Sequence, residues 1–190
     1  MGTSRNDPSP RAPEWLPTFA VLGNPKFPIE RQSLEVWTAA SQELGGALYR
    51  DLSSPIVAHA CEIANSRAEV FDALDAFDNT AAYEYKSGLA VEFARRALAR
   101  SAEHAGGGRT FASELLAETV TYFVSRDLPS YVGAKGRIAT AAEAIALKDS
   151  IGDVARRAVE RAGEPPMGTR AWGRYVRGVI ENLSSRKVTP

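Results

Sequence analysis

The chain has 190 residues, of which 44% are hydrophobic and 24% are charged, and these values are ordinary for one globular domain with its own core. Its 23 Lys and Arg residues balance its 23 Asp and Glu residues, so it lacks the strong positive charge of a dedicated nucleic-acid-binding domain. No apolar run approaches the roughly 18 to 20 residues that a membrane-spanning helix needs, and a single cysteine excludes an internal disulfide. We therefore expect a cytoplasmic protein that does not bind membranes.

The charge is distributed unevenly along the chain. Residues 51–92 hold eight acidic and two basic side chains, a net charge of −6. Residues 156–187 hold eight basic and three acidic side chains, a net charge of +5. Such a bipolar chain can bind an acidic partner or associate with itself head to tail, or the asymmetry can serve solubility alone.

Residues 1–28 form a proline-rich segment that contains six of the eleven prolines. Each proline lacks a backbone N–H and disfavours a helix at the preceding residue, so we predict an extended arm here. The arm also carries large apolar side chains, among them Trp15 and Phe19, which are too apolar for a solvated tail. We predict that these two residues bind the helical body or another protein chain.

The first helical pattern runs from about Ile29 to Tyr49, and Gly45 and Gly46 loosen it near its end. One face of this predicted helix comprises Leu34, Trp37, Ser41, Leu44 and Leu48.

Two shorter helices are predicted next. Ser54 followed by Pro55 is a favourable helix start, because proline at the first helical position loses no hydrogen bond. Ser66 with Glu69 three residues later is a capping-box pattern, which predicts the start of a third helix. The apolar side of that third helix comprises Val70, Leu74 and Phe77.

The pattern from Ala81 to Asp127 predicts a helical hairpin at the centre of the fold. One face of its first arm comprises Ala82, Tyr85, Leu89 and Phe93. The second arm is apolar around most of its circumference, and its narrow solvent-facing stripe comprises Glu114, Glu118, Thr121 and Ser125. Gly106–Gly108 supply positive φ angles that break the helix, which makes the arms antiparallel neighbours, and Thr110 is the predicted N-cap of the second arm.

Two further helices are predicted after the hairpin. Thr140 with Glu143 gives a second capping box, and the helix that it starts continues to about Ala162. A last helix runs from about Thr169, and its buried face comprises Trp172, Val176, Val179 and Leu183.

The sequence shows no alternating strand pattern and no internal repeat. We therefore predict an all-α fold, with a single globular domain of about six to seven helices over residues 29–184. The proline-rich arm of residues 1–28 precedes this domain, and a short tail at residues 185–190 follows it.

An acidic row on the predicted third helix comprises Glu69, Asp72, Asp75 and Asp78. Carboxylates on successive turns can bind a divalent metal, and Glu114 with Glu118 would have to supply the second half of a hydrolase site. A spacing of three drifts around the helix by roughly 60° per step, so a solvated acidic face is the simpler interpretation. We predict no metal and no cofactor.

Nucleophilic and phosphate-binding motifs are also weak. Cys61 and His59 lie two residues apart, so a helix directs them to different sides, and we interpret Cys61 as a small buried residue. The glycine-rich stretches at residues 106–110 and 133–137 match neither the P-loop nor the dinucleotide fingerprint, so we interpret both as turns.

The last predicted helix carries the clearest functional pattern. Arg170, Arg174 and Arg177 repeat four and three residues apart, with Trp172 and Tyr175 between them. Such a stripe can dock on an acidic protein surface or follow nucleic-acid phosphates, although cations at a helix C-terminus are favourable in themselves. We predict that these three arginines bind a partner.

No catalytic constellation assembles from these motifs. We therefore predict a non-enzymatic helical subunit or adaptor that binds other protein chains, including further copies of itself, through its arm and its basic last helix. The first alternative is a nucleic-acid-binding module that uses the same arginines. The second is a divalent-metal-dependent hydrolase that uses the acidic row.

Overall fold

The computed structural model describes residues 23–43, 45–84, 88–127, 132–133 and 138–184. Within these ranges the chain forms eight helices and an isolated β-bridge between Val132 and Ile138, so the all-α prediction is confirmed. Most of the predicted arm, with Trp15 and Phe19, lies outside the described residues, as does the tail. The helices are α1 (Ile29–Glu43), α2 (Gly45–Leu52), α3 (Pro55–Ser66), α4 (Val70–Glu84), α5 (Leu89–Glu103), α6 (Gly108–Asp127), α7 (Ala141–Ala162) and α8 (Thr169–Ser184).

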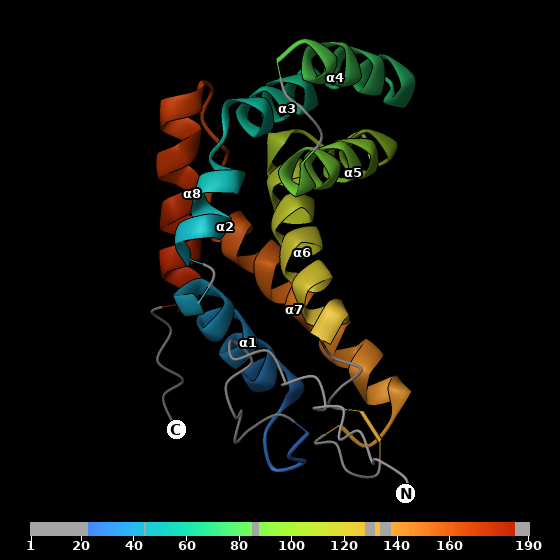
Figure 1. Ribbon diagram of the computed structural model, residues 1–190, viewed down its shortest axis with the longest axis vertical. Coiled ribbons are helices and arrows are strands. Elements are labelled where there is room, and N and C mark those ends of the chain that lie inside the picture. Colours follow the sequence, from blue (N-terminus) through green and yellow to red (C-terminus); the bar gives the residue numbers. More distant parts are fainter. Residues whose placement is uncertain (1–22, 44, 85–87, 128–131, 134–137, 185–190) are drawn as a thin grey trace, which may run out of the picture.

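Helices α6 and α7 pack against each other along the middle of the molecule (Figure 1). On its other side α6 packs against α5, while α7 packs against α1, which in turn contacts α8. Helix α4 packs against α3 and α5 and forms one end of the molecule, far from α8 (Figure 1). No helix of the described residues is long and apolar enough to cross a membrane.

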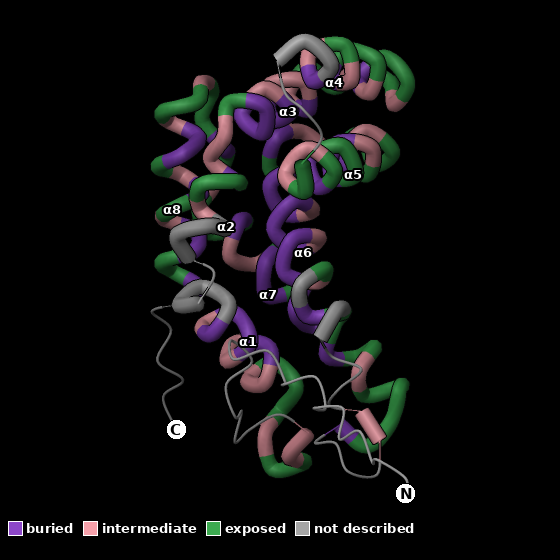
Figure 2. The backbone as a smooth tube through the Cα atoms, viewed as in Figure 1, coloured by how far each residue is buried: buried purple, intermediate pink, exposed green. Residues whose placement is uncertain are grey.

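Most of α6 is buried, as predicted for the second arm of the hairpin (Figure 2). The contacts between α5 and α6 run in antiparallel order, because Phe93 stacks near Tyr122 while Arg100, further along α5, reaches back to Glu114. The predicted hairpin is therefore confirmed. The fully buried apolar residues of α6 include Phe111, Leu115, Leu116 and Val120.

The prediction of one continuous first arm is wrong. Helix α4 ends before α5 begins, and Gly88 caps α5 in an extended conformation with φ −146° and ψ 161°. Glycine loses more conformational freedom in a helix than other residues, which favours a break at this position. The predicted face therefore spans two helices: Phe93 is buried but Leu89 is 47% exposed, and the side chains of Ala82 and Tyr85 lie outside the described part.

The turn between α5 and α6 also differs from the prediction. Ala105 has the positive φ of 49°, whereas none of Gly106–Gly108 has one. The predicted N-cap at Thr110 is wrong because α6 begins two residues earlier, at Gly108. The backbone N–H of Gly108 instead donates to the side-chain oxygen of Asn65, in α3, at 2.8 Å.

The capping box predicted at Ser66 and Glu69 is wrong as well. Ser66 is the last residue of α3, and its hydroxyl donates back to the carbonyl of Ile63 at 2.7 Å. Arg67 then turns the chain with φ 53°, and α4 starts only at Val70. A serine near a helix end can bond to the preceding turn as readily as to the following one, so the pattern was ambiguous.

The predicted first helix is two helices in the structure. Helix α1 ends at Glu43, and α2 starts at Gly45, where the pair of glycines was expected to loosen the helix. Glycine disfavours helix continuation by about 1 kcal/mol relative to alanine, so two in succession favour a break. The start of α3 at Pro55, after Ser54 in an extended conformation, is confirmed.

The two last helices follow the predictions closely. Thr140 accepts a hydrogen bond from the backbone N–H of Glu143 at 3.2 Å, so the second capping box is confirmed. The indole N–H of Trp172 donates to the carbonyl of Leu52 at 2.8 Å, which joins α8 to the end of α2. The predicted buried face of α8 is confirmed for Trp172, Val176, Val179 and Leu183.

Candidate functional site

A groove of about 460 Å³ lies between α5, α6 and α7. It contains the whole polar stripe that the sequence predicts on the second hairpin arm. Most of its other lining is charged, so it offers little apolar surface to a drug-like ligand. Its charged residues are Arg96, Arg100, Glu114, Glu118, Lys148, Asp149 and Arg156.

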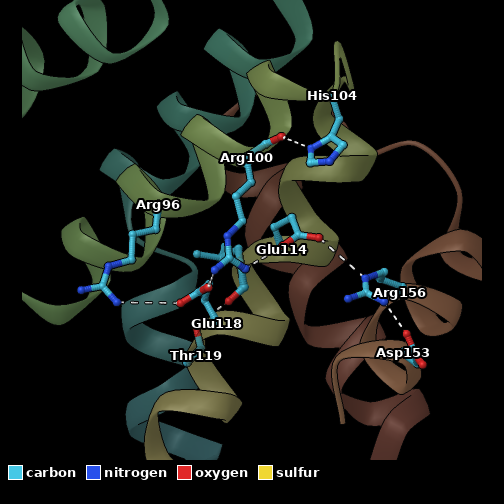
Figure 3. Close-up of polar contacts among 9 residues, drawn as sticks. Arg96, Arg100, His104, Glu114, Glu118, Thr119, Asp153 and Arg156 are labelled. Carbon is cyan, nitrogen blue, oxygen red and sulfur yellow. Dashed lines mark hydrogen bonds and ion pairs between the residues drawn. The ribbon is translucent and has the colours of Figure 1, made fainter. Parts of the chain in front are cut away.

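The two glutamates of this groove are not the solvent-facing residues that the sequence predicts. The side chain of Glu114 is 16% exposed and that of Glu118 is 12% exposed. Arg100 pairs with both, at 3.1 Å to Glu114 and 2.5 Å to Glu118 (Figure 3). Arg156 of α7 reaches Glu114 at 3.7 Å, and Arg96 of α5 reaches Glu118 at 4.0 Å. One ionic network therefore joins three helices.

Nearly covered carboxylates are unfavourable unless they are paired, and here arginines from two neighbouring helices neutralise them. Arg156 is further engaged by Asp153, one turn earlier in α7, and Arg96 by Glu92 at 2.9 Å. These arginines are therefore already bound to acidic side chains of the same molecule. The arrangement of these arginines is that of an internal brace.

The acidic row of Glu69, Asp72, Asp75 and Asp78, for which a solvated face is the predicted interpretation, is divided between two roles. Asp78 makes a two-pronged bond to Arg95 of α5, at 2.9 Å to Nε and 3.0 Å to the terminal nitrogen. This hydrogen bond raises the pKa of the Arg95 guanidinium. Asp72 and Asp75 are exposed on the outer side of α4. Among the described residues, no group of three His, Cys, Asp or Glu side chains is placed to hold a metal ion.

Phe71 on α4 is a surface feature that sequence reasoning missed. Its side chain is 82% exposed, and the exposed carboxylates of Asp72 and Asp75 lie within one helical turn of it. The predicted apolar face of this helix comprises Val70, Leu74 and Phe77, and Phe71 lies outside it. An aromatic residue away from the buried face and next to acidic neighbours is a signal that the sequence does contain.

The three arginines of α8 are all exposed, on the side opposite the buried tryptophan. Arg177 lies over the ring of Tyr49, with 4.5 Å between the guanidinium carbon and the ring centroid. Trp172 is buried, and the hydroxyl of Tyr175 donates to the carbonyl of Gly163 at 3.1 Å. The two aromatic residues predicted to flank the basic stripe therefore serve the core and do not form an exposed stacking surface.

Cys61 and His59 do not form a nucleophile pair. Cys61 is buried, and burial raises the pKa of its thiol to about 12, so the thiolate that a nucleophile requires is strongly disfavoured. The imidazole of His59 instead lies 3.2 Å from the hydroxyl of Thr80 and 3.6 Å from a carboxylate oxygen of Glu62. The interpretation of Cys61 as a small buried residue is confirmed.

Comparisons with protein-family models, with curated proteins and with solved structures found no match to this chain. The surfaces described above are therefore the features of the chain that indicate a function. Two of them combine exposure with a strong chemical character: the outer face of α4, with Phe71 between carboxylates, and the arginine stripe of α8.

Proposed function

We propose that this chain is a helical protein-association module that binds other protein chains through the outer faces of α4 and α8. The exposure of Phe71 is the observation that carries the proposal. Burying a phenylalanine side chain contributes roughly 1.5–3 kcal/mol, and aromatic residues are enriched at the centres of protein interfaces. A phenylalanine that is 82% exposed on a helix surface leaves this contribution unused until a partner covers it.

The surroundings of Phe71 support a protein partner. An apolar contact with a charged rim is the usual anatomy of a specific protein interface, and Asp72 and Asp75 supply such a rim. The predicted contribution of Trp15 and Phe19 in the arm remains part of this proposal.

Photo-crosslinking in cells that produce the protein tests the proposal directly. A photoreactive amino acid replaces Phe71 in one variant and Ile145 in the control, because Ile145 is also an exposed apolar residue, on α7, at 61% exposure. We expect a discrete protein adduct from position 71 and only weak, diffuse adducts from position 145. Equal and diffuse labelling from both positions would contradict a specific interface on α4.

The exposed arginines of α8 favour nucleic-acid binding as a second candidate function. The buried position of Trp172 argues against base stacking, so only phosphate contacts would contribute. Fluorescence anisotropy with labelled single- and double-stranded oligonucleotides, at several salt concentrations, tests this candidate. Binding that weakens steeply with salt, and weakens again in Arg170→Glu and Arg174→Glu variants, would support it. No binding at low salt would exclude it.

A further inference from the structure

The outer face of α4 carries two carboxylates beside one aromatic side chain. Asp72 and Asp75 are exposed, and the exposed side chain of Phe71 lies beside them; Glu69 is also exposed but precedes the helix. Neither Asp72 nor Asp75 has an ion-pair partner among the described residues. Helix α4 lies at one end of the molecule, and exposed residues run along its outer side (Figure 2). This face therefore has unpaired negative charge and an uncovered apolar centre.

The outer face of α8 has the opposite charge at a similar spacing. Arg170, Arg174 and Arg177 lie seven residues apart from first to last, which is about 10 Å along a helix at 1.5 Å per residue. Asp72 and Asp75 are about 4.5 Å apart along α4 by the same rise, and Arg170 and Arg174 are about 6 Å apart along α8. Arg170 and Arg174 are exposed and have no ion-pair partner among the described residues.

Exposed apolar surface is also present next to the arginines. Met167 precedes the first turn of α8 and its side chain is 59% exposed. A flexible thioether adapts readily to an aromatic ring and gains from sulfur–aromatic contact. The α8 face thus offers an apolar contact for Phe71 beside cations for the carboxylates.

The two faces do not meet within one molecule. Helix α4 packs against α3 and α5, whereas α8 packs against α1, α2, α3 and α7, and α3 lies between α4 and α8 in Figure 1. A contact between them therefore needs two copies of the chain. In such a pair, one copy still has a free α4 face and the other still has a free α8 face. The contact is therefore heterologous, and a third copy can bind unless the assembly closes into a ring.

We propose that the arginine stripe of α8 in one copy docks on the acidic face of α4 in a second copy, with Phe71 against Met167. The inference rests on the proposed protein-association function and names a second copy as the partner. It also explains why residues 51–92 and residues 156–187 carry opposite net charges.

Mixing two charge-reversal variants tests the head-to-tail geometry. One variant carries Arg170→Glu and Arg174→Glu, and the other carries Asp72→Lys and Asp75→Lys. Each variant alone retains one functional face but lacks its complement, so we expect each to remain monomeric in light scattering. An equimolar mixture should regain association, because the intact α4 face of the first variant meets the intact α8 face of the second, and the two reversed faces are also complementary in charge.

The wild-type chain should show a mass that rises with concentration and falls with salt, as expected for contacts between exposed charges. Each charge-reversal variant should raise the self-dissociation constant at least about tenfold. Arg161→Glu is the matched control, since Arg161 is an exposed arginine of α7 that belongs to neither face, and it should associate like the wild type. Circular dichroism verifies that every variant is folded.

Two results would overturn the inference. The first is a wild-type chain that stays monomeric at high concentration and low salt, even if the crosslinker at position 71 captures a different protein. That combination of results would support the proposed protein-association function and would contradict self-association. The second is a wild-type oligomer that both charge-reversal variants still form, since the interface would then lie elsewhere.

Discussion

The side-chain oxygen of Asn65, near the end of α3, accepts a 2.8 Å hydrogen bond from the backbone N–H of Gly108, the first residue of α6. The amide nitrogen of the same side chain lies 3.4 Å from the sulfur of Met167, in the segment between α7 and α8. Asn65 therefore connects three parts of the chain that are remote in sequence. A Cβ atom at position 108 would lie 2.6 Å from the Asn65 oxygen, so any side chain there would force the Asn65 amide to move.

Replacing Asn65 with alanine should destabilise the fold. The first N–H groups of a helix have no partner within it, and losing a side chain that caps them typically costs about 1 kcal/mol. Chemical denaturation followed by circular dichroism measures the change. Thr110→Ala is the control, because Thr110 has the residue type of a cap but lies inside α6, and we expect a change below about 0.5 kcal/mol. Equal losses in the two variants would mean that Asn65 does not act as the cap.

Replacing Arg100 with methionine should cost more stability than replacing Arg95 with methionine. Arg100 neutralises Glu114 and Glu118, which are nearly covered, and leaving such carboxylates with fewer partners costs about 1–3 kcal/mol. Arg95 and Asp78 form a well-aligned pair, but both side chains are 46% exposed, so water replaces much of that interaction. We expect a loss of at most about 1 kcal/mol there. Urea denaturation of both variants gives the comparison, and a larger loss for Arg95 would show that the groove network is not a brace.

Cys61 should make the fold less stable at high pH. Burial raises the pKa of its thiol from 9.0 to about 12, and the negative charges of Glu62 and Glu164 add to this shift. Between these two pH values the unfolded chain loses a proton that the folded chain keeps, so the contribution of this residue to stability decreases as pH rises. The slope is on the order of 1 kcal/mol per pH unit.

A Cys61→Ala variant should flatten the decline of the unfolding free energy above pH 9.0, which denaturation at a series of pH values measures. The decline should not vanish, because burial also raises the pKa of the Tyr175 hydroxyl. Thiol reagents at pH 8 should label Cys61 only after unfolding. Rapid labelling of the folded protein would show that the thiol is more accessible than its burial indicates.

Gly178→Ala should stabilise the protein. Gly178 lies within α8, and a Cβ atom there would meet nothing within 4 Å, so alanine gains helix propensity without a clash. We expect an increase of about 0.5–1 kcal/mol in the free energy of unfolding, with a higher melting temperature.

Gly163→Ala is the matched control for this substitution. A Cβ atom at position 163 also meets nothing within 4 Å, but the residue has φ 82°, which is strained for alanine. Thermal denaturation should therefore show opposite shifts for the two variants. A stabilising effect at both positions would mean that backbone conformation does not govern the outcome.

Local patterns predicted those features whose determinants lie within a few residues. The capping box of Thr140 and Glu143 and the buried face of α8 through Trp172 both depend on neighbours three to four positions away. Residues three or four positions apart lie on the same side of a helix, so the sequence spacing predicts these contacts directly. The same reasoning failed at Ser66, because two helices adjoin there and the local pattern does not state which of them the serine serves.

The amino-acid sequence by itself determined the helical class, the core-facing sides of most helices and the opposite charges of the two halves. Only the tertiary structure decided that Asn65 caps α6, that arginines of α5 and α7 cover Glu114 and Glu118, and that none of the described helices covers Phe71. The physical reason is distance along the chain. A segment tens of residues away can cap a helix, form an ion pair or cover a side chain without changing the sequence pattern near the residue that it contacts. These interactions are therefore seen only when the helices are placed in space.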